Sequence, residues 1–126
     1  MKRIITYISL VAIISSFTIQ SGIDDVVDAM KAGNYNEVAK FFDTNVEISM
    51  PDKSNSYSRS QAALVLKDFF TTNSIKGFDI IHKGENGGSQ YCIGTLKSKN
   101  GTYRTTIFMK QKADVQVLQE LRFENR

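Results

Sequence analysis

Five side chains in the second half of the chain carry functional groups suited to catalysis or ligand binding: His82, Tyr91, Lys97, Arg104 and Phe108. His82 is the only histidine, and an imidazole can act as a general acid or base near neutral pH. Lys97 and Arg104 would attract a carboxylate or a phosphate group, and Phe108 would line an apolar pocket. We therefore treat the five residues as ligand-binding candidates and assign no catalytic residue.

The same sequence argues against several kinds of active site. One histidine and one cysteine cannot supply the three or four nitrogen or sulfur ligands that zinc requires, so we expect no metal and no cofactor. No Gly-x-Ser-x-Gly motif is present for a serine nucleophile. Asp79 alternates with the apolar residues Phe78 and Ile80, which predicts an outward-facing carboxylate rather than a catalytic base. Cys92, the only cysteine, is predicted to be a small buried side chain.

The first 21 residues have the pattern of a secretory signal peptide. Lys2 and Arg3 precede an uncharged, mostly apolar run over residues 4–19, and small or polar residues follow. The run is shorter than the roughly 20 residues that a membrane-spanning helix needs. We therefore predict a signal peptide over residues 1–21 and a mature domain over residues 22–126. The domain would be exported, periplasmic or secreted, without stable membrane insertion once the signal is cleaved.

The sequence leaves the cleavage position open. Cleavage after Ser21 would place the bulky Ile19 three residues before the cut, whereas cleavage after Thr18 would place Ser16 there. Either cut removes two cations and no anions, so the formal net charge falls from +3 to +1. The basic composition therefore belongs largely to the signal peptide, and we expect no nucleic-acid partner.

Residues 91–111 are predicted to form a β-hairpin around Asn100-Gly101. Both turn residues tolerate the positive φ that a type I′ turn requires at its two central positions. Lys97 and Arg104 would then face one another, so they should be solvated, neutralised by neighbouring acids or joined by a bound anion. Counting outward from this turn predicts the pairs Lys97–Arg104, Thr95–Thr106 and Ile93–Phe108 on one face, and Leu96–Thr105, Gly94–Ile107 and Cys92–Met109 on the other.

Hydrophobic periodicity predicts the elements that position these side chains. Apolar residues recur every three or four positions from Ile23 and again over residues 35–42, which indicates two short helices separated by Gly33. Ser58 and Gln61 fit a capping box, so a third helix is expected to begin there. Short links between the last strands predict an antiparallel meander in an α+β domain. The remaining expected elements are a strand over 46–50, a loop over 52–57 and four strands over 75–83, 90–98, 102–111 and 115–123.

The last strand of this meander determines which acids lie near the two cations. If the chain turns at Lys112-Ala113, Phe108 pairs with Val117. Glu120 would then lie on the sheet face opposite to the two cations, and only a bulge would bring it round.

Three short motifs carry a resemblance to a known family: Tyr91-Cys92-Ile93-Gly94, Gly101-Thr102-Tyr103-Arg104 and Leu121-Arg122-Phe123-Glu124. Together with the leader and a first helix containing Ile23, Val26 and Met30, they make the chain similar to the small exported bacterial family called domain of unknown function 4783. The order of helices and strands resembles the nuclear transport factor 2-like superfamily, which is often compared with cystatin-like folds. This resemblance implies a cone-shaped α+β domain over residues 22–126 and no known activity.

Two functional hypotheses follow for such a cone. The first is a non-enzymatic exported domain that binds a small apolar or anionic ligand in the cone, or a protein partner through the sheet. The alternative is a cone-type enzyme, with isomerase- or hydrolase-like acid/base chemistry, that uses His82 with Tyr91 or Arg104. Both sheet faces carry apolar residues, so the face left open by the helices should form a homodimer. We expect the helices to cover the face with Ile93 and Phe108, leaving the basic pair at the mouth of the cone.

Overall fold

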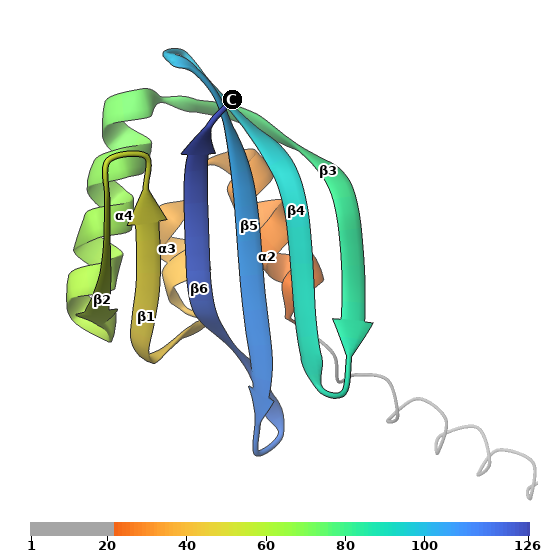
Figure 1. Ribbon diagram of the computed structural model, residues 1–126. Helices are drawn as coiled ribbons and strands as arrows, with labels where there is room; N and C mark the ends of the chain where they lie inside the picture. The colour runs from red at the N-terminus through yellow and green to blue at the C-terminus, as the bar shows by residue number, and fades with distance from the viewer. Residues whose placement is uncertain (1–21) are drawn as a thin grey trace, which may run out of the picture.

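In the computed structural model, which describes residues 22–126, three helices lie behind a curved sheet of six strands (Figure 1). The helices are α2 (Ile23–Ala32), α3 (Tyr35–Ala39) and α4 (Arg59–Asn73). The strands are β1 (Phe42–Met50), β2 (Lys53–Ser58), β3 (Ile75–Asn86), β4 (Ser89–Ser98), β5 (Gly101–Lys112) and β6 (Val115–Asn125). The signal peptide predicted for residues 1–21 lies outside the described residues.

The helix boundaries follow local signals in the sequence. α2 ends at Gly33, whose φ of 68° is a left-handed conformation that glycine adopts without steric penalty. Ser58 is the N-cap of α4, and its hydroxyl oxygen accepts a hydrogen bond from the Gln61 N–H at 3.3 Å, as the capping box predicts. α3 is shorter than predicted, because the chain enters β1 at Phe42. None of these three helices combines the length and the apolar character needed to cross a membrane.

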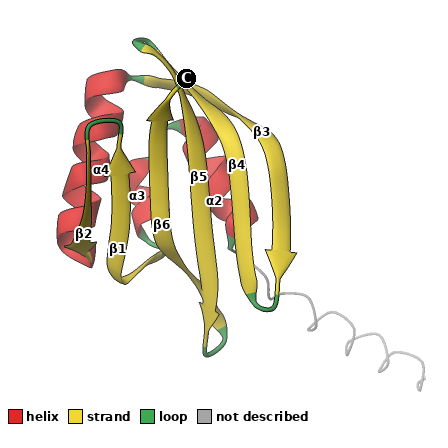
Figure 2. Cartoon of the chain, viewed as in Figure 1, coloured by secondary structure: helices red, strands yellow, loops and turns green. Residues whose placement is uncertain are grey.

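The prediction of a loop over residues 52–57 is wrong. Residues 53–58 form β2, an edge strand that pairs antiparallel with β1 (Figure 2). β2 carries mostly exposed polar side chains, with Tyr57 packed partly against the core. Backbone pairing with β1 holds such a strand without an apolar face, so hydrophobic periodicity cannot detect it.

The six strands follow the order β2-β1-β6-β5-β4-β3. The last four strands of the chain, β3 to β6, form the predicted antiparallel meander. β1 contains the strand predicted over residues 46–50, and it pairs in parallel with β6. This pairing joins β1 to the meander in one sheet. This pairing brings the early part of the domain against its end, and the Leu118 N–H donates to the Phe41 carbonyl at 2.6 Å where β1 begins.

The hairpin between β4 and β5 turns one residue earlier than predicted. Lys99 and Asn100 occupy the turn with negative φ, and Gly101 follows with a φ of 131°, so the predicted type I′ turn is wrong. The Asn100 side-chain amide donates to the Thr72 carbonyl at 3.3 Å and to Asn73 Oδ1 at 3.0 Å, which ties the turn to the end of α4. The strand pairs shift by two residues. Every side chain therefore keeps its predicted face but not its predicted partner.

The helices cover the face of the sheet opposite to the one that we predicted. Ile93 and Phe108 are half-buried on the open face. The covered face carries the fully buried residues Cys92, Leu96, Thr105, Ile107, Met109, Leu118, Leu121 and Phe123. This set lacks charge, whereas covering the other face would remove Lys97 and Arg104 from water at a high cost in hydration free energy. Cys92 is buried as predicted, and burial raises the pKa of its thiol.

Side chains occupy the space between the helices and the sheet. Val26 and Met30 of α2 and Leu66 of α4 are fully buried in the same cluster as the covered face. Gly94 on β4 makes room for the Phe78 ring, because a Cβ at residue 94 would lie 2.4 Å from Phe78 Cζ. This packing favours a filled cone over an open one.

Candidate functional site

All five candidate residues gather on the open face of the sheet. His82 comes from β3, Tyr91 and Lys97 from β4, and Arg104 and Phe108 from β5. Pairing between strands aligns several of them in rows, with Tyr91 opposite Phe108. The residues therefore share one surface, which is the outside of the sheet and not the mouth of the cone.

A bulge in β3 brings His82 to Tyr91. The register shifts between Ile80 and His82, which turns His82 onto the open face, although simple alternation would place it on the side of Phe78. His82 Nε2 and the Tyr91 hydroxyl oxygen lie 2.7 Å apart in an exposed hydrogen bond. The Tyr91 ring lies across Gly84, where a Cβ would be 2.6 Å from both a ring carbon and the hydroxyl oxygen. Glycine at this position therefore allows the contact between the two side chains.

Exposure limits the chemistry that the His82–Tyr91 pair can perform. Acid–base catalysis benefits from a site that excludes water, and this hydrogen bond lies at the surface. Arg104, the alternative partner of His82, lies on β5, so β4 stands between the two residues. The pair is equipped to exchange hydrogen bonds with a molecule bound on the open face.

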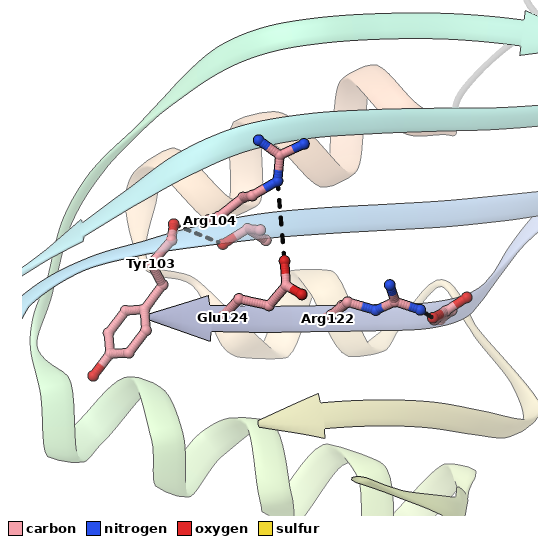
Figure 3. Close-up of polar contacts among 6 residues, drawn as sticks. Tyr103, Arg104, Arg122 and Glu124 are labelled. Carbon is pink, nitrogen blue, oxygen red and sulfur yellow. Dashed lines mark hydrogen bonds and ion pairs between the residues drawn. The ribbon is translucent and has the colours of Figure 1, made fainter. Parts of the chain in front are cut away.

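Lys97 and Arg104 do not form the facing pair of like charges that the sequence predicted, because the shifted register moves them to diagonal positions. Lys97 Nζ lies 2.7 Å from Asp79 Oδ2 on β3. Arg104 Nε lies 4.0 Å from Glu124 Oε1 on β6 (Figure 3). Asp79 faces outward, as predicted. Neighbouring acids thus neutralise both cations, which is one of the outcomes that the sequence left open.

A bulge at Gln119 in β6 brings further charges to the open face. The register shifts directly after Phe108, which therefore pairs with Glu120, so the predicted alignment of the last strand is wrong. Glu120 Oε2 lies 2.8 Å from Arg122 Nη2 (Figure 3). Glu47 of β1 lies beside Glu120 in the parallel strand pair. The bulge thus places Glu120 on the same face as the two cations.

Four half-buried side chains form the centre of this surface, and we call them the open-face band: Tyr91, Ile93, Phe108 and Val117. Ion pairs surround the band on the neighbouring positions of the strands. An apolar centre with a charged rim is the usual composition of a protein–protein contact surface. The surface is broad and carried by strands, so it suits a large partner better than a small molecule.

Asp43 is a buried carboxylate that joins β1 to the last hairpin. Its side chain is 11% exposed, and its Oδ2 lies 2.9 Å from Lys112 Nζ and 3.0 Å from Gln119 Nε2. Its Oδ1 accepts a hydrogen bond from the Thr44 N–H at 2.8 Å. The hydrogen bonds from Lys112 and then Gln119 lower the pKa of Asp43 from 3.8 to about 2. Sequence reasoning missed this residue, because Gln119 lies 76 positions further along the chain.

Asn73 is a buried amide that joins α4 to the β4–β5 hairpin. Its Oδ1 accepts hydrogen bonds from the Tyr103 hydroxyl at 3.1 Å and from Asn100 Nδ2 at 3.0 Å. Its Nδ2 donates to the Phe69 carbonyl at 2.9 Å. Figure 3 shows Tyr103 extending toward α4, away from the charges on the open face. Asp43 and Asn73 are both satisfied by protein partners, which marks them as structural anchors.

A family model described as "Domain of unknown function (DUF4783)" matches residues 23–124. The chain belongs to this family. The matched region begins at the first residue of α2 and ends one residue before the end of β6. Among curated proteins, none matches the chain.

Solved structures support both the DUF4783 family and a broader fold. A DUF4783 family protein from Bacteroides ovatus is 27% identical, with a TM-score of 0.78, and the alignment covers 81% of this chain and 93% of that chain. Another from Bacteroides fragilis is 28% identical, with a TM-score of 0.78, covering 85% of this chain and 100% of that chain. An NTF2-like protein of unknown function from Cytophaga hutchinsonii is 11% identical, with a TM-score of 0.58 and coverage of 80% and 83%. The DUF4783 chain thus has the predicted α+β, nuclear transport factor 2-like fold.

Proposed function

We propose that this protein is an exported, non-enzymatic domain that binds a second copy of itself through the open face of its sheet. The open-face band is the observation that carries the proposal. An antiparallel sheet with one face in water normally shows polar side chains there. Half-buried aromatic and aliphatic residues at the centre of that face support its burial against a partner.

The charges around the band favour a second copy over a partner selected by charge. Three ion pairs on the face join Lys97 to Asp79, Arg104 to Glu124 and Arg122 to Glu120. Each of these three cations is matched by a carboxylate within one copy, which limits the repulsion between two identical faces. Recognition of a charged partner would instead need a face dominated by one sign.

Light scattering of residues 22–126 at micromolar concentration tests the proposal, with twice the mass of one chain as the expected result. Phe108→Glu should yield a monomer, because a carboxylate at the centre of the interface would have to lose its hydration. Leu64→Glu is the matched control: Leu64 is 64% exposed on α4, away from the open face, so this variant should remain dimeric. Circular dichroism confirms that both variants fold. A monomeric wild type, or dissociation of both variants alike, would contradict the proposal.

The two other hypotheses have weaker support. A small apolar or anionic ligand in the cone would have to displace packed core side chains, and the five candidate residues lie outside the cone. An enzyme that uses His82 with Tyr91 rests on the 2.7 Å hydrogen bond between them, which is exposed. Native mass spectrometry of the protein from its own cells separates these cases, because a retained ligand of defined mass would favour the cone-ligand hypothesis over ours.

A further inference from the structure

Gly22 occupies a confined site immediately before α2. It is buried, and its φ of 135° is a conformation that favours glycine. A Cβ at this position would lie 2.7 Å from Gln90 Oε1 and 3.1 Å from Gln116 Cγ. Gln90 belongs to β4 and Gln116 to β6, so two glutamine side chains from the sheet enclose the residue that precedes the first helix.

The side-chain amides of the two glutamines differ in their hydrogen bonding. Gln90 Oε1 accepts a hydrogen bond from the Ile23 N–H at 3.1 Å, and Gln116 Nε2 donates to the Gly88 carbonyl at 3.3 Å. Gln116 Oε1 is buried, and within the described part of the chain it is the one buried side-chain polar atom without a partner. A buried acceptor without a donor is destabilising, so each such atom calls for an explanation.

We propose that the mature protein begins at Gly22 and that its new α-amino group donates a hydrogen bond to Gln116 Oε1. The proposal rests on the export proposed above. Hydrolysis of the Ser21–Gly22 peptide bond by a signal peptidase consumes one water, leaving a carboxylate on Ser21 and a protonated amine on Gly22. The amine presents three N–H donors at neutral pH, whereas the peptide nitrogen of the uncleaved chain presents one.

Further observations agree with a start at this residue. The family model begins at Ile23, directly after Gly22. Ser21 is a small residue of the kind that a signal peptidase accepts before the cut. The positive end of the helix dipole opposes a cation at the start of α2, and the carboxylates of Asp24 and Asp25 in the first turn offset it. These observations favour cleavage after Ser21 over cleavage after Thr18, the two positions that the sequence left open.

The direct test is the intact mass of the protein exported from cells that express the full 126-residue chain with its own leader. The expected mass is that of residues 22–126. A mass for residues 19–126, or for any other cleaved start, would overturn the inference while leaving export intact. A full-length mass would overturn both the inference and the proposed export.

A stability comparison tests the contact itself. Residues 22–126 and residues 21–126 are released from fusions by a protease that leaves no extra residue. The chain that starts at Gly22 should melt about 2–5 °C higher, because its terminal amine has more N–H donors to offer Gln116 Oε1 than a peptide nitrogen has. Gln116→Leu, which removes the acceptor, should abolish the difference between the two chains. Equal melting of the wild-type chains, or a difference that persists in Gln116→Leu, would overturn the assignment of Gln116 as partner.

Discussion

Asp43 is a single residue whose ionisation is linked to folding. Lys112 and Gln119 hold its charged form, so its pKa is about 2 in the folded protein against an ordinary value of 3.8. Because the pKa is lower in the folded protein, this stabilisation is fully present when the pH is above the ordinary pKa of 3.8. It is lost as the pH falls through about 2. A shift of this size corresponds to at most about 2 kcal/mol of unfolding free energy, because the Lys112 side chain is 53% exposed and solvent screens part of the interaction.

We expect Asp43→Asn to lower the unfolding free energy by about 1–2 kcal/mol at neutral pH. The difference between wild type and variant should shrink as the pH falls from about 4 to about 2, because the wild-type carboxylate becomes neutral in that range. Urea unfolding at a series of pH values measures both effects. Asp79→Asn is the control, since its exposed ion pair with Lys97 should contribute less than about 1 kcal/mol. A difference that stayed constant with pH would contradict the role given to Asp43.

The bulges in β3 and β6 decide what the sheet displays. A strand that alternates regularly presents every second side chain to one face, and one extra residue reverses that order beyond the bulge. The β3 bulge moves His82 from the side of Phe78 to the open face. The β6 bulge moves Glu120 beside Phe108. Without these two irregularities, the open face would lose both its histidine and one of its ion pairs.

Contact between β3 and β4 depends on the absence of a side chain at Gly94. A Cβ there would lie 2.4 Å from Phe78 Cζ and 2.6 Å from the Asp79 carbonyl oxygen, a backbone atom that cannot move aside without distorting the strand. We expect Gly94→Ala to lower the unfolding free energy by about 1–3 kcal/mol, measured by urea unfolding. Gly77→Ala on β3 is the matched control, because no atom lies within 4 Å of the new Cβ. An equal loss in both variants would show that crowding at Gly94 is not the cause.

The molecule as a whole has helices on one side of its sheet (Figure 1). The open-face band lies on the other side. Association through that band would couple folding to concentration, because a dimer stabilises only the folded chain. We therefore expect the Tm of residues 22–126 to rise with protein concentration in the micromolar range. Phe108→Glu should remove this dependence, and Leu64→Glu should retain it. A wild-type Tm that does not change with concentration would argue against a dimer that is linked to folding.

Much of the architecture could be predicted from local patterns. Gly33 caps the end of α2 and Ser58 caps the start of α4, because a left-handed glycine and a serine cap act within one turn of backbone. The four-strand meander follows from apolar runs joined by short links, and the assignment of side chains to the two faces of β4 and β5 follows from strict alternation. These features depend on residues a few positions apart, which is the range that a sequence pattern records.

The features on which the proposed association rests depend on residues far apart in the chain. β2 is a strand because β1 offers it backbone partners, and the hairpin turns at Lys99 and Asn100 where contacts with the end of α4 hold it. The helices pack against the uncharged face of the sheet. Which face is less costly to bury depends on the side chains of all the strands together, so the pattern of one strand does not reveal it. The contacts of Asp43 with Lys112 and Gln119 likewise formed only when β1 met the last hairpin. Periodicity therefore placed Tyr91, Lys97, Arg104 and Phe108 on one surface, and the bulge in β3 added His82 to it. Packing of the helices against the other face turned that surface outward.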